Sequence, residues 1–324
     1  MGPDTITPGI YFGLDEKTYH AAPWLGSTNI KELYASPPDY WYDSPMNPLR
    51  EIAEESFAQK FGTAIHYRIL HGEAEFLRRY RFVEGETGEA VSAEGLKNWI
   101  AGEGGVPAKL KADNERMVVE DFGISLLTEK TYNRILISAA MIVKNPHLAQ
   151  AFTGGFPEVS IFWHQDGVPC KARFDYLKQK AIVDLKSFRS KDRIRTLDET
   201  ILQDLFNYRY DGQAAHYLNG RLAARQLFED GKVFGDVVPS PEWLGKVLKN
   251  PEPNFVLVFY KADGMPISKS YQIAFGSPAH ASGRVLVDIA LRNYQTNLEQ
   301  YGTDAWVNAD EPFNIAEEDL PRWL

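Results

Sequence analysis

The sequence of 324 residues predicts one α/β domain with a mainly helical N-terminal part. Two observations lead to this fold class. Before residue 150, apolar residues recur at intervals of three and four, which is the period of a helix with one buried face. Between residues 158 and 187 the pattern changes to short alternating runs separated by turn residues, which is typical of consecutive strands. With 44% hydrophobic and 24% charged residues, the chain has the composition of a folded globular protein.

The N-terminal part is expected to form several helices. Ser27-Thr-Asn29 offers capping oxygens for the first one, and Pro37-Pro38 ends it. In the second, Phe57, Phe61, Ala64 and Ile65 share one face. This second helix is expected over about 52–71. Two further helices are expected around Leu96 to Ile100 and from Thr128 to Val143.

The middle of the chain predicts a three-stranded meander. Gln165-Asp-Gly167 and Lys178-Gln-Lys180 are breaks short enough for hairpins. Ser277 as N-cap and Pro278 as the first helical residue begin the last long helix. The expected strands are 158–163, 168–176, 181–187, 254–261 and 269–275, with a helix over 198–229 that is broken near Tyr208 to Asp211.

These patterns divide the single domain 1–324 into a helical part (1–150), a core (151–300) and an acidic tail (301–324). The one cysteine, Cys170, excludes an internal disulfide, a cysteine-based zinc site and a four-cysteine iron–sulfur cluster. The sequence contains no phosphate-binding loop of the ATPase type, so no ATP is expected. Without a visible targeting segment or membrane span, we expect a cytoplasmic protein.

The most informative segment for chemistry lies on two predicted strands. Asp184 and Lys186 are two residues apart and therefore project from the same face, and a hairpin brings Asp175 alongside. Two carboxylates and an ammonium group would suit a hard cation such as Mg²⁺, with the lysine beside an attacking water. The alternative is a solvated hairpin whose charges pair across the strands, because this short motif often occurs by chance.

Further polar residues could join this cluster. Gln213 and Tyr217 lie one helical turn apart on a single face. His66 should point away from the core face formed by Ala64 and Ile65, as a metal ligand would. Taken singly, His66 could equally be a hydrogen-bonded structural residue, and Tyr217 a core residue.

In their order and spacing, five motifs resemble those of the PD-(D/E)XK nuclease superfamily. They resemble most closely the branch with RecB-type nuclease domains, phage lambda exonuclease and RecE-type exodeoxyribonuclease VIII of phages and prophages. The motifs are Gly62-Thr-Ala-x-His66, Glu158-Val-Ser, Arg173-Phe-Asp175, Asp184-x-Lys186 and Gln213-x-x-x-Tyr217. The resemblance implies a restriction-endonuclease-like core, with a mixed sheet flanked by helices.

The resemblance also implies roles for these residues. Asp175 and Asp184 would bind Mg²⁺ or Mn²⁺ with the Leu185 carbonyl and His66, and Glu158 would act in the outer shell. Lys186 would activate the attacking water, while Gln213 and Tyr217 would position the DNA and the catalytic groups. Asp184 stands where many relatives have glutamate, which keeps the carboxylate and shortens its reach.

The net charge of −9 argues against a general nucleic-acid binder, but the charges are unevenly distributed. Residues 171–195 carry a local charge of +6, and residues 299–324 carry −6. A DNA backbone would therefore run beside the proposed site, although a solvated basic loop is the alternative. The free amides of the helix starting at Ser27 could hold a terminal 5′-phosphate. The expected DNA contacts are Arg173, Arg189, Lys191, Arg193, Arg195 and Ser27.

By the same resemblance we expect a metal-dependent, ATP-independent exonuclease that degrades double-stranded DNA from 5′ ends and leaves 3′ overhangs for recombination. A homo-oligomeric ring around DNA and a strand-annealing partner protein are implied as well. Two alternatives remain at this stage. One is a structure-specific or restriction-type endonuclease of the same fold, and the other is a DNA-binding recombination protein that does not cleave.

Overall fold

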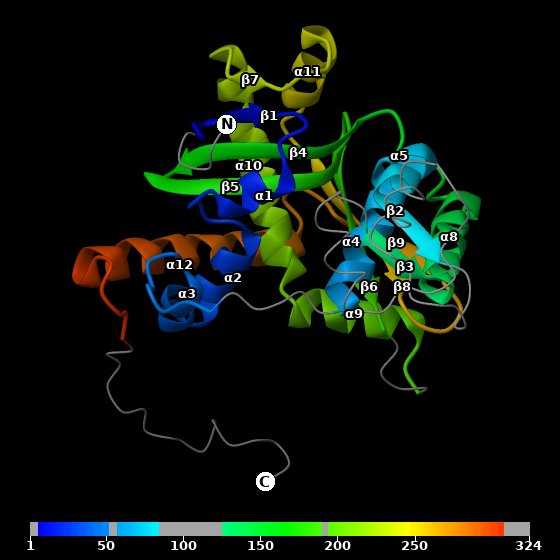
Figure 1. Cartoon of the computed structure of the whole chain (residues 1–324). Coiled ribbons are helices and arrows are strands. Elements are labelled where there is room, and N and C mark those ends of the chain that lie inside the picture. The colour runs from blue at the N-terminus through cyan, green and yellow to red at the C-terminus, as the bar shows by residue number, and fades with distance from the viewer. Residues whose placement is uncertain (1–5, 52–56, 84–124, 190–193, 308–324) are drawn as a thin grey trace, which may run out of the picture.

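A computed structural model describes residues 6–51, 57–83, 125–189 and 194–307 of the chain (Figure 1). The helix expected around Leu96 to Ile100 lies outside these ranges, as do Lys191, Arg193 and most of the acidic tail. None of the described helices is long and apolar enough to cross a membrane.

A mixed seven-stranded sheet forms the centre of the fold, with strand order β7-β1-β4-β5-β6-β8-β9. All neighbours pair antiparallel except β1 with β7 and β6 with β8. The strands are β1 (Gly9–Tyr11), β4 (Phe156–Gln165), β5 (Val168–Leu177), β6 (Ala181–Phe188), β7 (Val233–Phe234), β8 (Asn254–Lys261) and β9 (Ser268–Ile273), and a separate parallel pair is formed by β2 (Tyr80–Val83) and β3 (Ser125–Thr128).

Helices cover both faces of the sheet (Figure 1). On one face, α10 packs across the central strands, and α12 and α2 pack against α10. On the other face, α4, α5 and α8 form a second apolar cluster with alternate residues of β6 and β8. The helices are α1 (Glu16–Ala21), α2 (Ser27–Ala35), α3 (Pro37–Asp43), α4 (Phe57–Leu70), α5 (Gly72–Arg79), α8 (Glu129–Lys144), α9 (Leu197–Asn207), α10 (Tyr210–Glu229), α11 (Pro241–Leu248) and α12 (Pro278–Tyr301). The predicted fold class is confirmed.

Local sequence signals account for several element boundaries. The Ser277 side chain accepts a hydrogen bond from the His280 amide at 3.3 Å and so caps α12. The turn between β4 and β5 places Asp166 and Gly167 at positive φ, as a two-residue hairpin requires. One detail of the prediction was wrong, because Gly26, and not Ser27, occupies the N-cap of α2. α2 ends at Ala35, just before Pro37-Pro38, as predicted. The same prolines also begin α3, which was not predicted, because proline fits the first turn of a helix.

The predicted break in the long helix is confirmed between α9 and α10. Arg209 adopts the left-handed conformation there, with φ 50° and ψ 50°. α10 then lies so close to α12 that a β-carbon on Gly283 would sit 2.0 Å from the Asp211 carbonyl oxygen. This close approach fixes α10 between α12 and the sheet, and the first turn of α10 carries Gln213 to the sheet.

Candidate active site

The candidate active site lies where two neighbouring strands separate. β5 and β6 pair only through Tyr176 with Val183 and Leu177 with Ile182. At the next position the backbone ladder stops, and the Asp175 side chain takes over: its Oδ2 accepts a hydrogen bond from the Leu185 amide at 2.7 Å. Asp175 therefore replaces a strand partner and is held against β6, so the expected hairpin does bring it to the neighbouring strand.

On β6, two charged residues occupy positions that otherwise belong to the core. Ile182 and Phe188 face the larger apolar cluster beneath α10, whereas Val183 and Leu185 face the cluster of α4 and α8. By the alternation of a strand, Asp184 and Lys186 share the α10 face with Ile182. The Lys186 Nζ lies 2.5 Å from Asp184 Oδ2, so the two side chains project together as predicted.

Asp184 is 1% exposed, and its two oxygens differ in their surroundings. Oδ1 accepts a hydrogen bond from Gln213 Nε2 at 2.9 Å. Oδ2 faces the Lys186 ammonium, and no other described residue donates a hydrogen bond to it. Burial raises the pKa of Asp184 to about 6 in spite of the Lys186 charge, and the nearby Asp175 carboxylate raises it further. A buried carboxylate oxygen with an unused lone pair is a suitable cation ligand.

The remaining ionisable groups of the cluster are tuned by the same burial. Burial raises the pKa of Asp175. Burial would lower the pKa of Lys186, but the charges of Asp184 and Asp175 outweigh it and raise that pKa, so the lysine stays protonated. Lys186 thus neutralises one of the two carboxylates.

His66 comes to this cluster from α4. Its Nδ1 lies 3.5 Å from Asp175 Oδ2, while the preceding Ala64 and Ile65 are fully buried on the core side of the helix, as predicted. Burial and the Lys186 charge lower the pKa of His66 to about 4. The ring is therefore neutral at pH 7, which is the state in which an imidazole can bind a metal ion.

Glu158 occupies a strained position beside the cluster. It has φ 50° within β4 and stands opposite Asp175, at the one gap in the β4–β5 ladder. Its Oε2 lies 2.9 Å from His71 Nε2 and 3.0 Å from an Arg173 guanidinium nitrogen. Burial would raise its pKa, but the His71 hydrogen bond and the Arg173 charge lower it to about 2. These contacts occupy Glu158 and fix Arg173, which also donates to the Leu14 carbonyl at 2.7 Å.

Tyr217 lies one turn beyond Gln213 in α10 and is 8% exposed. Its ring packs 5.5 Å from that of Phe174, and a hydrogen bond joins its side chain to that of Ser27 at the start of α2. Burial raises the pKa of Tyr217, and the charges of Asp184 and Asp175 add to the effect, which places it near both carboxylates. Tyr217 and Ser27 therefore tie α2 to the site.

Two neighbours of the site were missed by the sequence analysis. Lys186 Nζ lies 5.3 Å from the centre of the Tyr210 ring, and Lys31 Nζ lies 5.8 Å from it. Lys31 also donates to the Tyr208 carbonyl at 3.3 Å. Little in the sequence indicated that Lys31 and Tyr210 belong to the site. Lys31 lies on the polar side of an amphipathic helix, and Tyr210 lies at a helix break. Only the folding of α2 onto α10 brings them together.

The predicted DNA-contacting residues beyond the site are partly described. Arg189 is exposed just after β6, and Arg195 is exposed and donates to Gln203. Lys191 and Arg193 lie outside the described residues. Arg189 and Arg195 therefore lie on the chain that leaves the site after Lys186, whereas Arg173 on β5 is held by Glu158 and the Leu14 carbonyl.

The arrangement suits a divalent cation that is shared with a substrate. Within the described residues, no three His, Cys, Asp or Glu side chains are arranged to hold a metal ion by themselves. Mg²⁺ in such sites is commonly held by one or two carboxylates, with substrate phosphate and water completing the shell. Asp175 and Asp184 supply two carboxylates, the buried Asp184 Oδ2 has an unused lone pair, and the Leu185 carbonyl is adjacent in the chain. The oxygen donors present fit Mg²⁺ or Mn²⁺.

Comparison with known proteins places this site in a family. Residues 47–227, more than half of the chain, match the family described as "PDDEXK-like domain of unknown function (DUF3799)". The chain belongs to this PDDEXK-like family. The matched segment contains both carboxylates, Lys186 and Gln213. The predicted superfamily is thus confirmed, whereas the RecE-type branch stays a prediction.

One solved structure has a fold similar to that of this chain. The crystal structure of a "Putative exonuclease" from Eubacterium rectale has a TM-score of 0.50 with 15% sequence identity, and the match covers 88% of each chain. At this identity the likeness shows the fold alone. A second solved structure, named SSO0001, has a TM-score of 0.26 and 10% identity over 75% of this chain and 88% of that chain, and it carries no argument. No curated protein sequence matches the chain significantly.

Proposed function

We propose that this member of the PDDEXK-like family is a metal-dependent, ATP-independent exodeoxyribonuclease. It would degrade double-stranded DNA from 5′ ends and leave 3′ overhangs for recombination. The observation that carries the proposal is the convergence of Asp175, Asp184 and Lys186 where β5 and β6 separate. The fold likeness to the "Putative exonuclease" from Eubacterium rectale supports this choice of reaction.

Each residue of the cluster has a role in phosphodiester hydrolysis. Asp175 and Asp184 would hold Mg²⁺ or Mn²⁺ together with the Leu185 carbonyl, and His66 is a further predicted ligand. The ion would supply positive charge to a phosphoryl oxygen. Lys186, protonated and 19% exposed, would orient the attacking water and offset the negative charge that develops on the phosphorus centre. Gln213 fixes the orientation of Asp184 through its 2.9 Å hydrogen bond.

The surroundings of the site favour a nucleic-acid substrate. Exposed aromatic rings lie along the chain that leads into α10, where Phe206 is 50% and Tyr208 is 49% exposed. The Tyr208 ring is 5.9 Å from that of Tyr210, which contacts the Lys186 ammonium. Bases stack on such rings while cations such as Lys31 hold the backbone. This rim would bind unpaired bases at the end that is being degraded.

The proposal extends to the assembly. A homo-oligomeric ring enclosing DNA and a strand-annealing partner protein remain inferences from the resemblance. A cytoplasmic location remains an expectation from the sequence alone. The mass of the purified protein in solution, with and without a DNA end, tests the ring. A protein that stays monomeric in both conditions would contradict it.

The decisive experiment is digestion of linear duplex DNA labelled at either the 5′ or the 3′ end, with Mg²⁺ and without ATP. We expect release of label from the 5′ end first, and no reaction with EDTA. Closed circular DNA should stay intact, because an exonuclease needs an end. Nicking of the circle would instead indicate the endonuclease alternative, and release from the 3′ end would refute the proposed polarity.

Variants separate catalysis from folding. Asp184→Asn and Lys186→Met should each lower the cleavage rate by about 10²-fold or more. The first removes a carboxylate that would hold the metal ion, and the second removes a positive charge that would offset the negative charge of the transition state. Lys246→Met is a matched control, since Lys246 is exposed on α11 and pairs only with Glu242 at 2.6 Å among the described residues. Wild-type rates in the first two variants would refute the assigned site. A wild-type protein without any cleavage would favour the non-catalytic alternative.

A further inference from the structure

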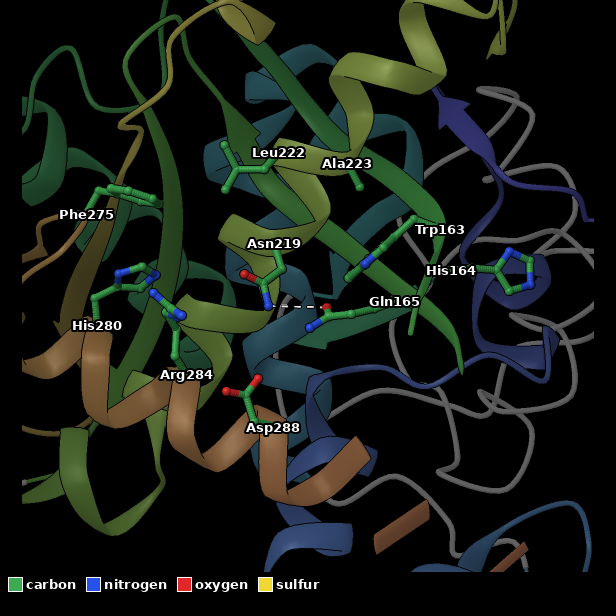
Figure 2. Close-up of a pocket in the computed structure, with 10 residues that line it drawn as sticks. All are labelled: Trp163, His164, Gln165, Asn219, Leu222, Ala223, Phe275, His280, Arg284 and Asp288. Atoms are coloured by element: carbon green, nitrogen blue, oxygen red, sulfur yellow. Dashed lines mark hydrogen bonds between the residues drawn. The ribbon is translucent and has the colours of Figure 1, made fainter. Parts of the chain in front are cut away.

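A second concave site lies away from the carboxylates, between the end of β4, the middle of α10 and the start of α12 (Figure 2). The cavity measures about 360 Å³. Trp163, Leu222 and Phe275 give it an apolar wall, and Gln165 and Asn219 are joined by a 3.2 Å hydrogen bond across it. None of these residues takes part in the proposed nuclease chemistry.

A buried histidine at one end of this cavity lacks a hydrogen-bond acceptor. His280 is 2% exposed and lies in the first turn of α12. Its Nδ1 accepts a hydrogen bond from the Gly276 amide at 3.0 Å, so Nδ1 carries no proton. A neutral ring must then carry its proton on Nε2, and Nε2 is buried without a partner among the described residues. Buried donors are rarely left unsatisfied, and the ones that are mark a place for a ligand or a water.

Arg284 brings positive charge to the same end of the cavity, and the lining also contains the carboxylate of Asp288, one turn further along α12. Arg284 follows His280 by one turn of α12, and Figure 2 shows the two side chains next to each other. Burial lowers the pKa of His280, and the charge of the neighbouring Arg284 lowers it further. The Arg284 side chain is exposed. The N-terminus of the 24-residue α12 adds its own partial positive charge.

We propose that this cavity binds a small molecule that carries an oxyanion, a phosphate or a carboxylate, on a flat apolar body. The oxyanion accepts the Nε2 proton of His280 and pairs with Arg284, which can form two parallel hydrogen bonds to either group. The His280 Nε2 atom is shielded from water. The exposed Arg284 side chain therefore has to move for the oxyanion to reach it. The flat body packs on Phe275, a half-buried ring that already lies 4.8 Å from that of His280. Asn219 and Gln165 offer further polar contacts.

The test is a titration of the full chain, labelled with ¹⁵N in its histidines, in EDTA. The probes are inorganic phosphate, thymidine 5′-monophosphate, benzoate and uncharged thymidine. We expect the Nε2 signal that disappears in His280→Asn to shift and saturate with the anionic probes and to stay unchanged with thymidine. Tighter binding of the monophosphate than of benzoate would identify a phosphate ligand, and the reverse order a carboxylate.

Arg284→Gln should weaken binding of the anions about tenfold or more. Arg292→Gln, an exposed arginine two turns further along α12, is the matched control and should bind as the wild type does. Absence of a saturable shift at the His280 signal with every anionic probe would overturn the proposal. Equal affinities of the Arg284→Gln and Arg292→Gln variants would also overturn it. Both outcomes are independent of nuclease activity, since no divalent cation is present.

Discussion

The electrostatics of Asp184 lead to a prediction that Asp184→Asn makes the protein more stable while lowering its cleavage rate. In the folded chain this carboxylate is 1% exposed and shares its surroundings with Asp175. Asparagine keeps the shape and an oxygen that can accept the Gln213 hydrogen bond, but it carries no charge to bury. The gain in stability should therefore depend on whether the wild-type carboxylate is ionised.

The magnitude follows from the shift in the pKa. The pKa of Asp184 rises from 3.8 to about 6 on folding, mainly through burial. Each unit corresponds to about 1.4 kcal/mol, so ionisation costs the folded state roughly 3 kcal/mol at neutral pH. Because the folded pKa is the higher one, the cost is absent below pH 3.8, grows between pH 3.8 and 6, and is complete above. The new amide faces the Lys186 ammonium, so we expect a net gain of about 1–3 kcal/mol at pH 7.

Urea unfolding in EDTA at pH 7 and at about pH 4 measures this difference. Asp184→Asn should exceed the wild type at pH 7 and come close to it at the lower pH. Asp263→Asn, at an exposed loop position, controls for the loss of one negative charge. Addition of Mg²⁺ should stabilise the wild type by about 2.7 kcal/mol at a concentration 100 times its dissociation constant, and should leave the variant unchanged. A variant that is no more stable than the wild type at pH 7, or a gain that is independent of pH, would refute the reasoning.

Three further predictions follow from other sites. Glu158→Gln should lower the free energy of unfolding by roughly 2 kcal/mol at pH 7. The difference should vanish as pH falls from 4.5 towards 2, because His71 and Arg173 stabilise only the ionised carboxylate. A difference that persists at pH 2 in acid titration would contradict this. Gly283→Ala should destabilise by about 1–3 kcal/mol in thermal unfolding, since its β-carbon meets the Asp211 carbonyl at 2.0 Å. Replacing Phe206 and Tyr208 together by alanine should weaken binding of a single-stranded oligonucleotide about tenfold or more by fluorescence anisotropy, with unchanged stability; unchanged affinity would exclude the aromatic rim.

Much of the fold is encoded in short-range patterns. The strands β4, β5 and β6 follow from alternation and two short turns, and the start of α12 follows from Ser277-Pro278. The break before Tyr210 was also visible in the sequence. The short strands β1 and β7 were not predicted, because three and two residues carry no measurable period. They exist through pairing with β4 and with each other, which is a tertiary interaction.

The candidate site divides in the same way. Asp184 and Lys186 share a face by the geometry of any strand, so their proximity could be predicted from spacing alone. The sequence could not show that β5 and β6 separate at Asp175, or that Glu158 is held by His71 and Arg173. Those features depend on residues far apart in the chain.

By itself the sequence determined the order of the elements, the five motifs and the uneven distribution of charge. The tertiary structure decided how these residues act on one another. Burial beneath α10 is what raises the pKa of Asp184, and the packing of α2 on α10 is what brings Lys31 and Tyr210 to Lys186. The physical reason is that residue type and spacing fix which groups are present and which way they project along one element. The desolvation and charge coupling that tune them arise only when separate elements exclude water between them.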